Sequence, residues 1–453
     1  MKVGLKLEEI LEATGGKLIR RGEAESWLSF CRDSRKVKKG DFFIPLKGER
    51  FDGHDFIEDA VMRGATGSLW GREDSPNLGI TLIGVKDTLE ALGKMGDRIR
   101  RKWGGEIVGI TGSAGKTTTK EIIWAGLSAF GNVHKTPGNY NNLVGVPISL
   151  LALSKEDRFS CVEMGMNSPG EIAKLAEIAA PDWSIITSIG PAHIGAFKDL
   201  SGIEKEKGSI LDFTKKGAVF PAGHPLLTSK ATKSGIRFIT TGPAGELELV
   251  RWQKEKLIIR YIDTRLEFDI QFSTPVEAED FTHALGIAIL MQLDLDRFVD
   301  GVRENYTPPE RRSRIYKGKF TVIDDSYNAN PLSTKKALEL LGRISGKRKI
   351  FIFGDMLELG EQEEKLHREI GEYVAESGID TFVVIGRRAY WSGEEAEKRG
   401  VNTFFVENFM ELEQLMDIIL GENDVVLVKA SRAMRLERIV DYLLKKIEVK
   451  NAV

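Results

Sequence analysis

The sequence lacks the features that mark secreted and membrane proteins. Its 453 residues include only two cysteines, Cys31 and Cys161, too few for a disulfide framework. Both lie in apolar segments, as buried thiols in a reducing compartment do. No run approaches the roughly 18 consecutive apolar residues of a membrane span, and residues 1–10 lack the apolar core of a secretory signal. We therefore expect a cytoplasmic protein with no segment inserted in a membrane.

The chain also lacks an excess of either charge. Its 65 Lys and Arg residues are balanced by 67 Asp and Glu residues, which gives a formal net charge of -2. Nucleic-acid-binding domains usually show clustered positive charge, so we expect no nucleic acid among the partners. Repeats of fixed period and low-complexity segments are absent as well, which excludes solenoids and disordered scaffolds. The length then predicts about two to four globular domains.

The residue pattern divides the chain into three segments. Residues 1–85 combine one short helical pattern with short strands broken by Gly, Asp and Pro, which is typical of a small α/β domain. Residues 86–308 open with a helical pattern and continue with strands and helices in alternation. The pair Pro308 and Pro309 marks the next break, and the alternation restarts within residues 309–453. Strands joined by crossover helices predict parallel sheets in both later segments, the last of them doubly wound.

The middle segment contains two further local signals. Residues 235–275 turn strand-like, and we expect them to form a β-rich flap on the same domain. The helix after Gly165 carries a start signal, with Ser168 as N-cap, Pro169 at the first helical position and Glu171 completing a capping box.

A glycine-rich loop follows the first strand of the middle segment and runs directly into a helix. It comprises Thr111, Gly112, Ser113, Ala114, Gly115, Lys116, Thr117 and Thr118. In such a loop the backbone N–H groups surround phosphate oxygens, Lys116 reaches the β- and γ-phosphates, and Thr117 binds Mg2+. The match is imperfect, because Ile110 stands where the general pattern has glycine. The strand, loop and helix together predict a nucleoside triphosphate site with Mg2+.

Nucleotide binding alone does not separate a motor, a switch, a kinase and a ligase. The chain lacks the Asn-Lys-x-Asp motif that recognises guanine, which disfavours a GTPase. Glu163 ends the following strand, where it would supply a second Mg2+ ligand if that strand lies beside the loop. The alternative role of Glu163 is to cap the next helix.

Taken in order, the motifs resemble those of the Mur ligase family over nearly the whole chain. They are DSR at 33–35, GDFFIPLKGERFDGHDFI at 40–57, GITGSAGKTTTKE at 109–121, KTPGNYNNLVGVP at 135–147, VEMGMNSPGEIA at 162–173, GPAHIGAF at 190–197, DDSYNANPLS at 324–333, GDMLELG at 354–360 and VKASR at 428–432. The YNANP and GDMLELG strings favour the members that add D-alanyl-D-alanine to UDP-N-acetylmuramoyl-tripeptide. The tripeptide-forming members carry an Asp-Asn-Pro-Arg motif that this chain lacks.

The resemblance implies a fold and a reaction. The three α/β domains would be a small UDP-substrate domain, a central P-loop ATPase-like domain with a parallel sheet, and a C-terminal Rossmann-like domain. The reaction would be ATP-dependent amide formation through an acyl phosphate, in the synthesis of peptidoglycan. An acyl phosphate is needed because a carboxylate repels nucleophiles and has no good leaving group.

The resemblance also implies roles for individual residues. Lys116 would act on the ATP phosphates, and Thr117 and Glu163 would hold one Mg2+. A second Mg2+ would be held by Glu163 with His193 and a carbamylated Lys207, with Lys205 as the second choice for the carbamate. Lys116, Glu163, His193 and Lys207 are therefore the expected catalytic residues.

Further residues are implied to bind the substrates. The ATP contacts of the last domain would be Asp325, Asn328 and either Arg312 or Arg311, and the dipeptide carboxylate would bind Lys429, Ser431 and Arg432. Substrate and phosphate would lie near Asn139 and Asn142. The UDP-sugar would bind Ser34, Arg35, Lys47, Gly48 and Asp52. For Asn139 and Asn142, a simple asparagine-rich turn is the alternative.

The chain departs from the family at several positions. Glu279, Asp280 and His283 stand where a His-Asn pair and a second Asn are usual. Ser188 replaces a usual Asn, and Ala430 a common Gly. Such changes can alter nucleotide binding without changing the reaction.

Three other functions stay open at the level of sequence. A folylpolyglutamate-synthase-like ligase would use the same chemistry, but that family lacks the first domain in this form. An ATP-dependent switch or motor would turn over ATP without peptide substrates, and a simple kinase would release a stable phosphorylated product. We expect a monomer that closes about a hinge near residues 307–310. The motifs do not distinguish meso-diaminopimelate from lysine as the third residue of the acceptor peptide.

Overall fold

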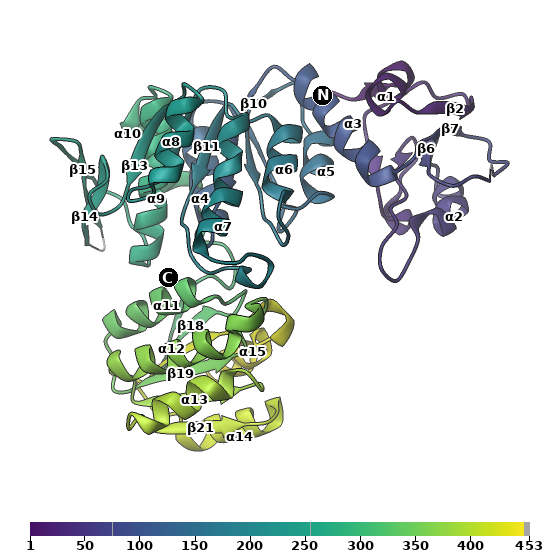
Figure 1. Ribbon diagram of the computed structural model, residues 1–453. Helices are drawn as coiled ribbons and strands as arrows, with labels where there is room; N and C mark the ends of the chain where they lie inside the picture. The colour runs from purple at the N-terminus through teal and green to yellow at the C-terminus, as the bar shows by residue number, and fades with distance from the viewer. Residues whose placement is uncertain (75, 254, 448–453) are drawn as a thin grey trace.

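The computed structural model describes residues 1–74, 76–253 and 255–447. Its strands form a five-stranded, a nine-stranded and a six-stranded sheet, with a separate two-stranded pair near the N-terminus. In Figure 1 the unit built on the nine-stranded sheet is central, with the N-terminal unit beside it and the C-terminal unit below it. The expected three-domain α/β architecture is confirmed, and the boundaries at 85/86 and 308/309 stay predictions. In the part of the chain that the structure describes, no helix combines the length and the apolar composition needed to cross a membrane.

The N-terminal unit is a small mixed sheet covered by short helices. Its elements are β1 (Leu5–Lys6), α1 (Leu7–Thr14), β2 (Lys17–Arg20), β3 (Ser26–Trp27), β4 (Phe30–Cys31), β5 (Phe42–Phe43), α2 (Ile57–Met62), β6 (Gly67–Trp70) and β7 (Thr81–Gly84). The larger sheet has the order β2-β7-β6-β5-β4. Trp27 and Phe42 meet edge to face, with ring centroids 4.8 Å apart. A Cβ on Gly67 would lie 2.5 Å from the Trp27 ring, so this core position requires glycine.

Helix α3 (Thr88–Lys102) connects this unit to the central one and packs against helices α5 (Gly145–Leu151) and α6 (Glu171–Ala179). The buried Arg100 fastens α3 to the central unit. Its guanidinium lies 2.6 Å from the Asp182 carboxylate and donates to the carbonyl oxygens of Ala179, Ala180 and Gly105. The charge and the donors of this side chain are therefore satisfied within the central unit.

Replacing Arg100 with Met should destabilise the protein, because it leaves the Asp182 carboxylate buried without its cation. Removing one partner of a buried pair costs about 3–5 kcal/mol. The neighbouring Arg101 supplies a matched control, since its pair with Asp97 is largely exposed to water and exposed pairs contribute about 1 kcal/mol or less. Urea unfolding of the Arg100→Met and Arg101→Met proteins measures both effects, and equal losses would contradict the prediction.

The central sheet has the order β16-β15-β14-β13-β12-β11-β8-β10-β9. Its strands are β8 (Glu106–Thr111), β9 (Asn132–Lys135), β10 (Asp157–Glu163), β11 (Trp183–Ile186), β12 (Gly217–Pro221), β13 (Arg237–Thr241), β14 (Leu247–Gln253), β15 (Lys256–Tyr261) and β16 (Thr264–Phe268). Its other helices are α4 (Lys116–Ser128), α7 (Leu200–Gly208), α8 (Pro225–Lys233), α9 (Pro275–Leu290) and α10 (Leu295–Asn305). Strands β8 and β10 are adjacent and parallel, which places Glu163 beside the glycine-rich loop.

Two local expectations for this domain are corrected by the structure. Residues 235–275 are β-rich and belong to the same domain, as expected, but they are part of the main sheet and not a flap: β13 and β14 continue the sheet, and β15 and β16 extend it in antiparallel fashion. Helix α6 begins at Glu171 rather than at Pro169. The Glu206 carboxylate accepts the N–H groups of Gly170 and Ile172, so a side chain distant in sequence caps this helix.

The C-terminal sheet has the order β17-β18-β22-β19-β20-β21. Its elements are β17 (Arg314–Lys317), β18 (Thr321–Asp325), α11 (Pro331–Arg343), β19 (Lys349–Gly354), α12 (Glu363–Glu376), β20 (Thr381–Ile385), α13 (Ala389–Lys398), β21 (Thr403–Val406), α14 (Phe409–Ile419), β22 (Val425–Lys429) and α15 (Glu437–Lys446). All strands except the edge strand β17 are parallel to their neighbours. Strand β22 lies between β18 and β19, so the chain reverses its direction of winding there. This is where doubly wound sheets place their ligands.

Candidate active site

A cavity of about 280 Å3 lies between the central and C-terminal domains. Many of the residues predicted to bind ATP, metal or substrate line it. They are Ser113, Ala114, Gly115, Lys116, Thr118, Asn139, Asn142, Glu163, His193, Arg312, Asp325, Asn328 and Lys429. The carboxyl ends of strands from two sheets thus converge on one cleft.

Contacts to the residues after the neighbouring strand β11 fix the conformation of the glycine-rich loop. Gly112 has a φ of 151°, and a Cβ there would lie 1.9 Å from Thr187 Oγ1, so no other residue fits. Ser188 Oγ accepts a hydrogen bond from the Ala114 N–H at 2.9 Å. Lys116 Nζ donates to the carbonyl oxygen of Gly112 at 2.7 Å, and burial lowers the pKa of this lysine. The lysine is therefore folded over the loop, close to where phosphates bind in such loops.

Oxygen donors for a metal ion lie next to the loop. Thr117 Oγ1 donates to Glu163 Oε2 at 2.8 Å. Burial alone would raise the pKa of Glu163, but the surrounding cations, with Lys120 foremost, hold it below its ordinary value. The residues fit Mg2+, which takes hard oxygen ligands and is usually bound by one or two carboxylates plus phosphates. The described residues contain no group of three or more His, Cys, Asp and Glu side chains placed to hold a metal.

Two residues that support Glu163 were missed in the sequence. Asn141 Nδ2 donates to Glu163 Oε1 at 2.9 Å. Lys120 is 1% exposed, donates to the Thr136 carbonyl oxygen at 3.0 Å and lies 3.8 Å from Glu163 Oε2. In the string GKTTTK, Lys120 looks like a solvated helical lysine. Only the packing of β10 against α4 shows that its side chain points inward.

Lys207 and Lys205 differ sharply in their surroundings. Lys207 is 2% exposed, and its Nζ lies 3.7 Å from the sulfur of Met166. Burial lowers its pKa well below the ordinary value, and the positive charge of Lys116 adds to this effect. Lys205 is exposed. A buried amine that stays neutral is the form that reacts with CO2, so the environment fits Lys207 and not Lys205 for a carbamate.

His193 lies on the loop after β11 and faces the C-terminal domain. Its backbone is left-handed, with a φ of 60°. Its Nδ1 lies 2.5 Å from Glu358 Oε2, and this contact lowers the pKa of Glu358. The predicted role of His193 as a metal ligand stays a prediction. In this structure its ring contacts a carboxylate that another domain supplies.

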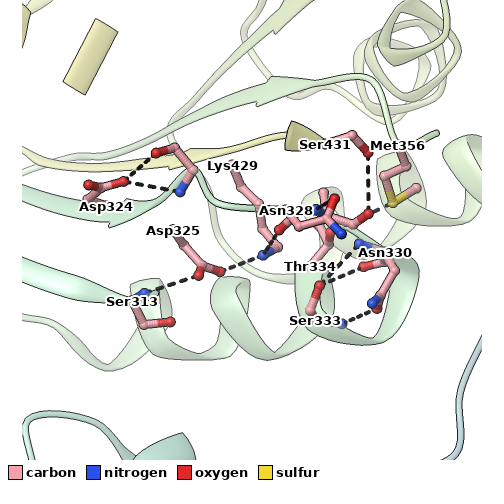
Figure 2. Close-up of polar contacts among 12 residues, drawn as sticks. Ser313, Asp324, Asp325, Asn328, Asn330, Ser333, Thr334, Met356, Lys429 and Ser431 are labelled. Atoms are coloured by element: carbon pink, nitrogen blue, oxygen red, sulfur yellow. Dashed lines mark hydrogen bonds and ion pairs between the residues drawn. The ribbon is translucent and has the colours of Figure 1, made fainter. Parts of the chain in front are cut away.

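The ends of β18 and β22 form a polar cluster, shown in Figure 2. Lys429 Nζ lies 2.5 Å from Asp325 Oδ2 and donates to the carbonyl oxygen of Asn328 at 3.0 Å. Asn330 is the N-cap of α11, and its Nδ2 donates a hydrogen bond to the carbonyl oxygen of Ser113, 3.2 Å away in the glycine-rich loop. This hydrogen bond connects the C-terminal domain directly to the predicted phosphate site.

The arginines after the Pro-Pro break point in different directions. The guanidinium carbon of Arg312 lies 4.0 Å from the ring centroid of Tyr327, and Arg312 lines the cleft. Arg311 instead pairs with Glu437 of α15 at 3.3 Å. The geometry therefore favours Arg312 as the cation near the phosphates.

Several residues predicted to bind substrate make structural contacts within the protein. Ser431 is buried, and its Oγ accepts the Leu357 N–H at 2.8 Å. Arg432 pairs with Glu437 at 3.2 Å. Asn142, although it lines the cleft, uses its Oδ1 to cap α5 through the N–H groups at residues 144 and 145. The substrate contacts proposed for these residues stay predictions.

A second cavity of about 860 Å3 opens between the N-terminal domain and the central domain. Ser34, Arg35, Lys47 and Gly48 line it, together with exposed aromatic rings of the same domain. Asp52 does not line it. The Asp52 carboxylate lies 2.6 Å from His54 Nδ1 and 2.8 Å from the Arg72 guanidinium, and thus fixes the loop that carries Lys47 and Gly48.

The central and C-terminal domains also meet at two glycines. Gly195 donates its N–H to the carbonyl oxygen of Glu358 at 3.1 Å. A Cβ on Gly195 would lie 2.7 Å from the backbone nitrogen of Gly360. This contact has no room for a side chain, and it lies beside the His193–Glu358 pair.

Gly195→Ala should therefore hinder the closed arrangement of the two domains. A misplacement of about 1 Å can cost about a hundredfold in rate, so we expect kcat to fall by roughly ten- to a hundredfold. Gly202→Ala is the matched control, because a Cβ at Gly202 meets nothing closer than 3.5 Å. Steady-state kinetics and nucleotide titration test both variants, and an unchanged kcat for Gly195→Ala would refute the prediction.

Comparison with known proteins agrees with this geometry. The fold and the cleft define a P-loop nucleotide-binding protein whose last domain covers the loop. The chain belongs to the Mur ligase family: residues 31–100 match the Mur ligase family catalytic domain, residues 110–283 the Mur ligase middle domain, and residues 310–432 the Mur ligase glutamate ligase domain.

Individual relatives span nearly the whole chain. The UDP-N-acetylmuramoyl-tripeptide--D-alanyl-D-alanine ligase of Bacillus subtilis is 32% identical over 91% of this chain and 92% of its own. The Escherichia coli enzyme of the same name is 29% identical over 97% and 98%. A crystal structure of MurF from Acinetobacter baumannii superposes with a TM-score of 0.89 at 28% identity, covering 98% of this chain and 99% of that chain. A Thermotoga maritima MurF complex with ADP gives 0.82 at 28% identity, covering 93% and 98%.

Proposed function

We propose that this protein is an ADP-forming ligase that joins D-alanyl-D-alanine to UDP-N-acetylmuramoyl-tripeptide and yields the pentapeptide precursor of peptidoglycan. The observation that carries the proposal is the alignment of nearly the full chain with enzymes of that name, at 29% identity or more. Two separate cavities support the proposal, because the glycine-rich cleft has room for ATP and the N-terminal cavity has room for part of a large second substrate.

The reaction begins by activating the terminal carboxylate of the tripeptide. A carboxylate oxygen attacks the γ-phosphorus of ATP, the bond to the bridging oxygen breaks, and ADP leaves. The amine of D-alanyl-D-alanine then attacks the acyl carbon, loses a proton, and expels inorganic phosphate. Lys116 and Arg312 place positive charge at the transferring group, where the reacting oxygens repel one another.

Metal ions fit the residues around the transferring group. Thr117 and Glu163 would hold one Mg2+ on the ATP phosphates. We propose a second Mg2+ held by Glu163, His193 and a carbamylated Lys207. When bound, such ions neutralise phosphate charge and polarise the reacting oxygens. The carbamate would turn the buried amine of Lys207 into an anionic oxygen ligand.

The remaining substrate contacts are assigned by position. Ser34, Arg35, Lys47 and Gly48 would hold the UDP-sugar in the N-terminal cavity. Asp325 and Asn328 would contact the nucleotide from the C-terminal domain, and Lys429 lies at the same sheet edge for the dipeptide carboxylate. We propose that the protein acts as a monomer in the cytoplasm, where ATP is supplied, and that it closes about residues 307–310 in each cycle.

The decisive experiment supplies ATP, Mg2+, D-alanyl-D-alanine and each UDP-muramoyl-tripeptide, with lysine or meso-diaminopimelate as third residue. Phosphate release that requires both peptide substrates, with a product of pentapeptide mass, is the expected result. Oxygen-18 in the tripeptide carboxylate should appear in the released phosphate. ATP turnover without the peptides would favour a switch or motor instead, and a stable phosphorylated product would favour a kinase.

A further inference from the structure

Helix α9 directs a buried acid into the nucleotide cleft, and the chemistry described above does not use it. Asp280 is 4% exposed and lines the cleft together with residues of the glycine-rich loop. Among the described residues its Oδ2 makes no hydrogen bond of good geometry, and the Thr119 side chain is the hydroxyl that lies beside the carboxyl group. Its Oδ1 lies against the loop, since a Cβ on Gly115 would come within 2.4 Å of it. A buried carboxyl oxygen without a partner is costly, and this one adjoins a ligand site.

Titratable groups on several elements face Asp280, among them Tyr306 after α10, whose pKa is raised by burial and by the nearby carboxyl groups of Glu277 and Asp280. On its own helix lie Glu277 and Glu279, and Lys336 approaches from α11 of the C-terminal domain. Lys336 Nζ lies 2.5 Å from Glu279 Oε2, so its charge is already paired. His283, one turn along α9, is neutral at physiological pH because burial lowers its pKa to about 3. Lys116 is the cation of the loop itself.

These surroundings favour the neutral form of the acid. Burial raises the pKa of Asp280 to about 8, against only a partial opposing effect of Lys336. An ionised carboxylate here would repel the phosphates of a nucleotide, whereas a protonated one offers an O–H donor. Below about pH 8 most of the Asp280 carboxyl groups are protonated and can donate, and above it most are anions.

We propose that Asp280 is a nucleotide-binding residue that acts as a neutral acid, donating a hydrogen bond from its carboxyl group to ATP in the cleft. The inference rests on the proposed function, since it takes ATP as the ligand of this site. It makes ATP affinity depend on the proton that Asp280 carries. Lys116 shares the cleft and also loses charge at high pH, so the contribution of Asp280 must be isolated by substitution.

The test compares the full-length protein with Asp280→Asn, which has nearly the same shape, keeps an N–H donor and cannot ionise. Binding of ATP with Mg2+ is measured by calorimetry from pH 6.5 to 9. The affinity of the unsubstituted protein should fall above about pH 8, by up to about tenfold per pH unit if the anion does not bind. The Asp280→Asn protein should match it at pH 6.5 and lose most of this decline. Asp280→Leu, which has no donor, should bind weakly at every pH.

Thermal unfolding provides a readout that does not depend on binding. When folding raises the pKa of a carboxyl group, the protein loses stability as the pH rises from the unfolded-state pKa toward the folded-state pKa of that group. The difference in unfolding temperature between Asp280→Asn and the unsubstituted protein should therefore increase with pH, in favour of Asp280→Asn, up to about pH 8 and stay constant above it. Parallel binding curves for the two proteins would overturn the inference alone. If the unsubstituted protein bound no ATP at any pH, the proposed function would fail and the inference with it.

Discussion

Lys207→Met is expected to reduce ligation by roughly a hundred- to a thousandfold, the loss that accompanies removal of one strong electrostatic contact to a reacting group. The side chain is buried beside Met166, and burial lowers its pKa, which favours the neutral amine, the form that takes up CO2. Methionine fills a similar volume without an amine, so the fold should persist. The initial rate of phosphate release with all substrates present measures the effect.

The control for this prediction lies two residues away. Lys205 is exposed on the same helix, so Lys205→Met should leave the rate within about twofold, as surface changes usually do. Depleting CO2 from the buffer should slow the unsubstituted protein, and bicarbonate should restore it. If Lys205→Met lost the activity and Lys207→Met kept it, the carbamate would have to be reassigned.

Local sequence signals predicted those parts of the site that depend on neighbouring residues. The strand, the loop and Lys116 are consecutive, so their spacing was sufficient to predict them. The placement of Glu163 required one added assumption, that its strand lies beside the loop, and the pairing of β8 with β10 confirms it. The parallel sheets followed from the alternation of strands and helices, because crossover helices leave few other arrangements.

Contacts between distant segments were not predictable in this way. Glu206 caps α6 from 36 residues away, and the helix begins at Glu171 and not next to Ser168. Lys120 and Asn141 reach Glu163 only after three elements have packed together. The sequence shows that such side chains are polar, but which groups they contact depends on how the elements pack in the folded protein. The same holds for Asp280, whose importance arises from the loop and the domain packed over it.

Lys116→Met should abolish phosphoryl transfer, with turnover reduced by about a thousandfold or more, because it removes the fixed cation nearest the transferring group. The fold should be little affected. In this structure Lys116 Nζ donates to the Gly112 carbonyl oxygen and holds no ion pair, so methionine leaves no buried anion without its partner.

Lys120→Met provides the matched contrast on the same helix. Lys120 is buried and lies 3.8 Å from Glu163, so its loss leaves the buried Glu163 carboxylate without its nearest cation, whereas Glu121 keeps its pair with Lys135. We expect a lowered free energy of unfolding for Lys120→Met, on the order of 3–5 kcal/mol, and nearly unchanged stability for Lys116→Met. Urea unfolding and ADP release with all substrates present separate the two outcomes. Phosphate release within tenfold of normal in Lys116→Met would show that this lysine does not act on the transferring group, because its charge would then be dispensable in the step that most needs it.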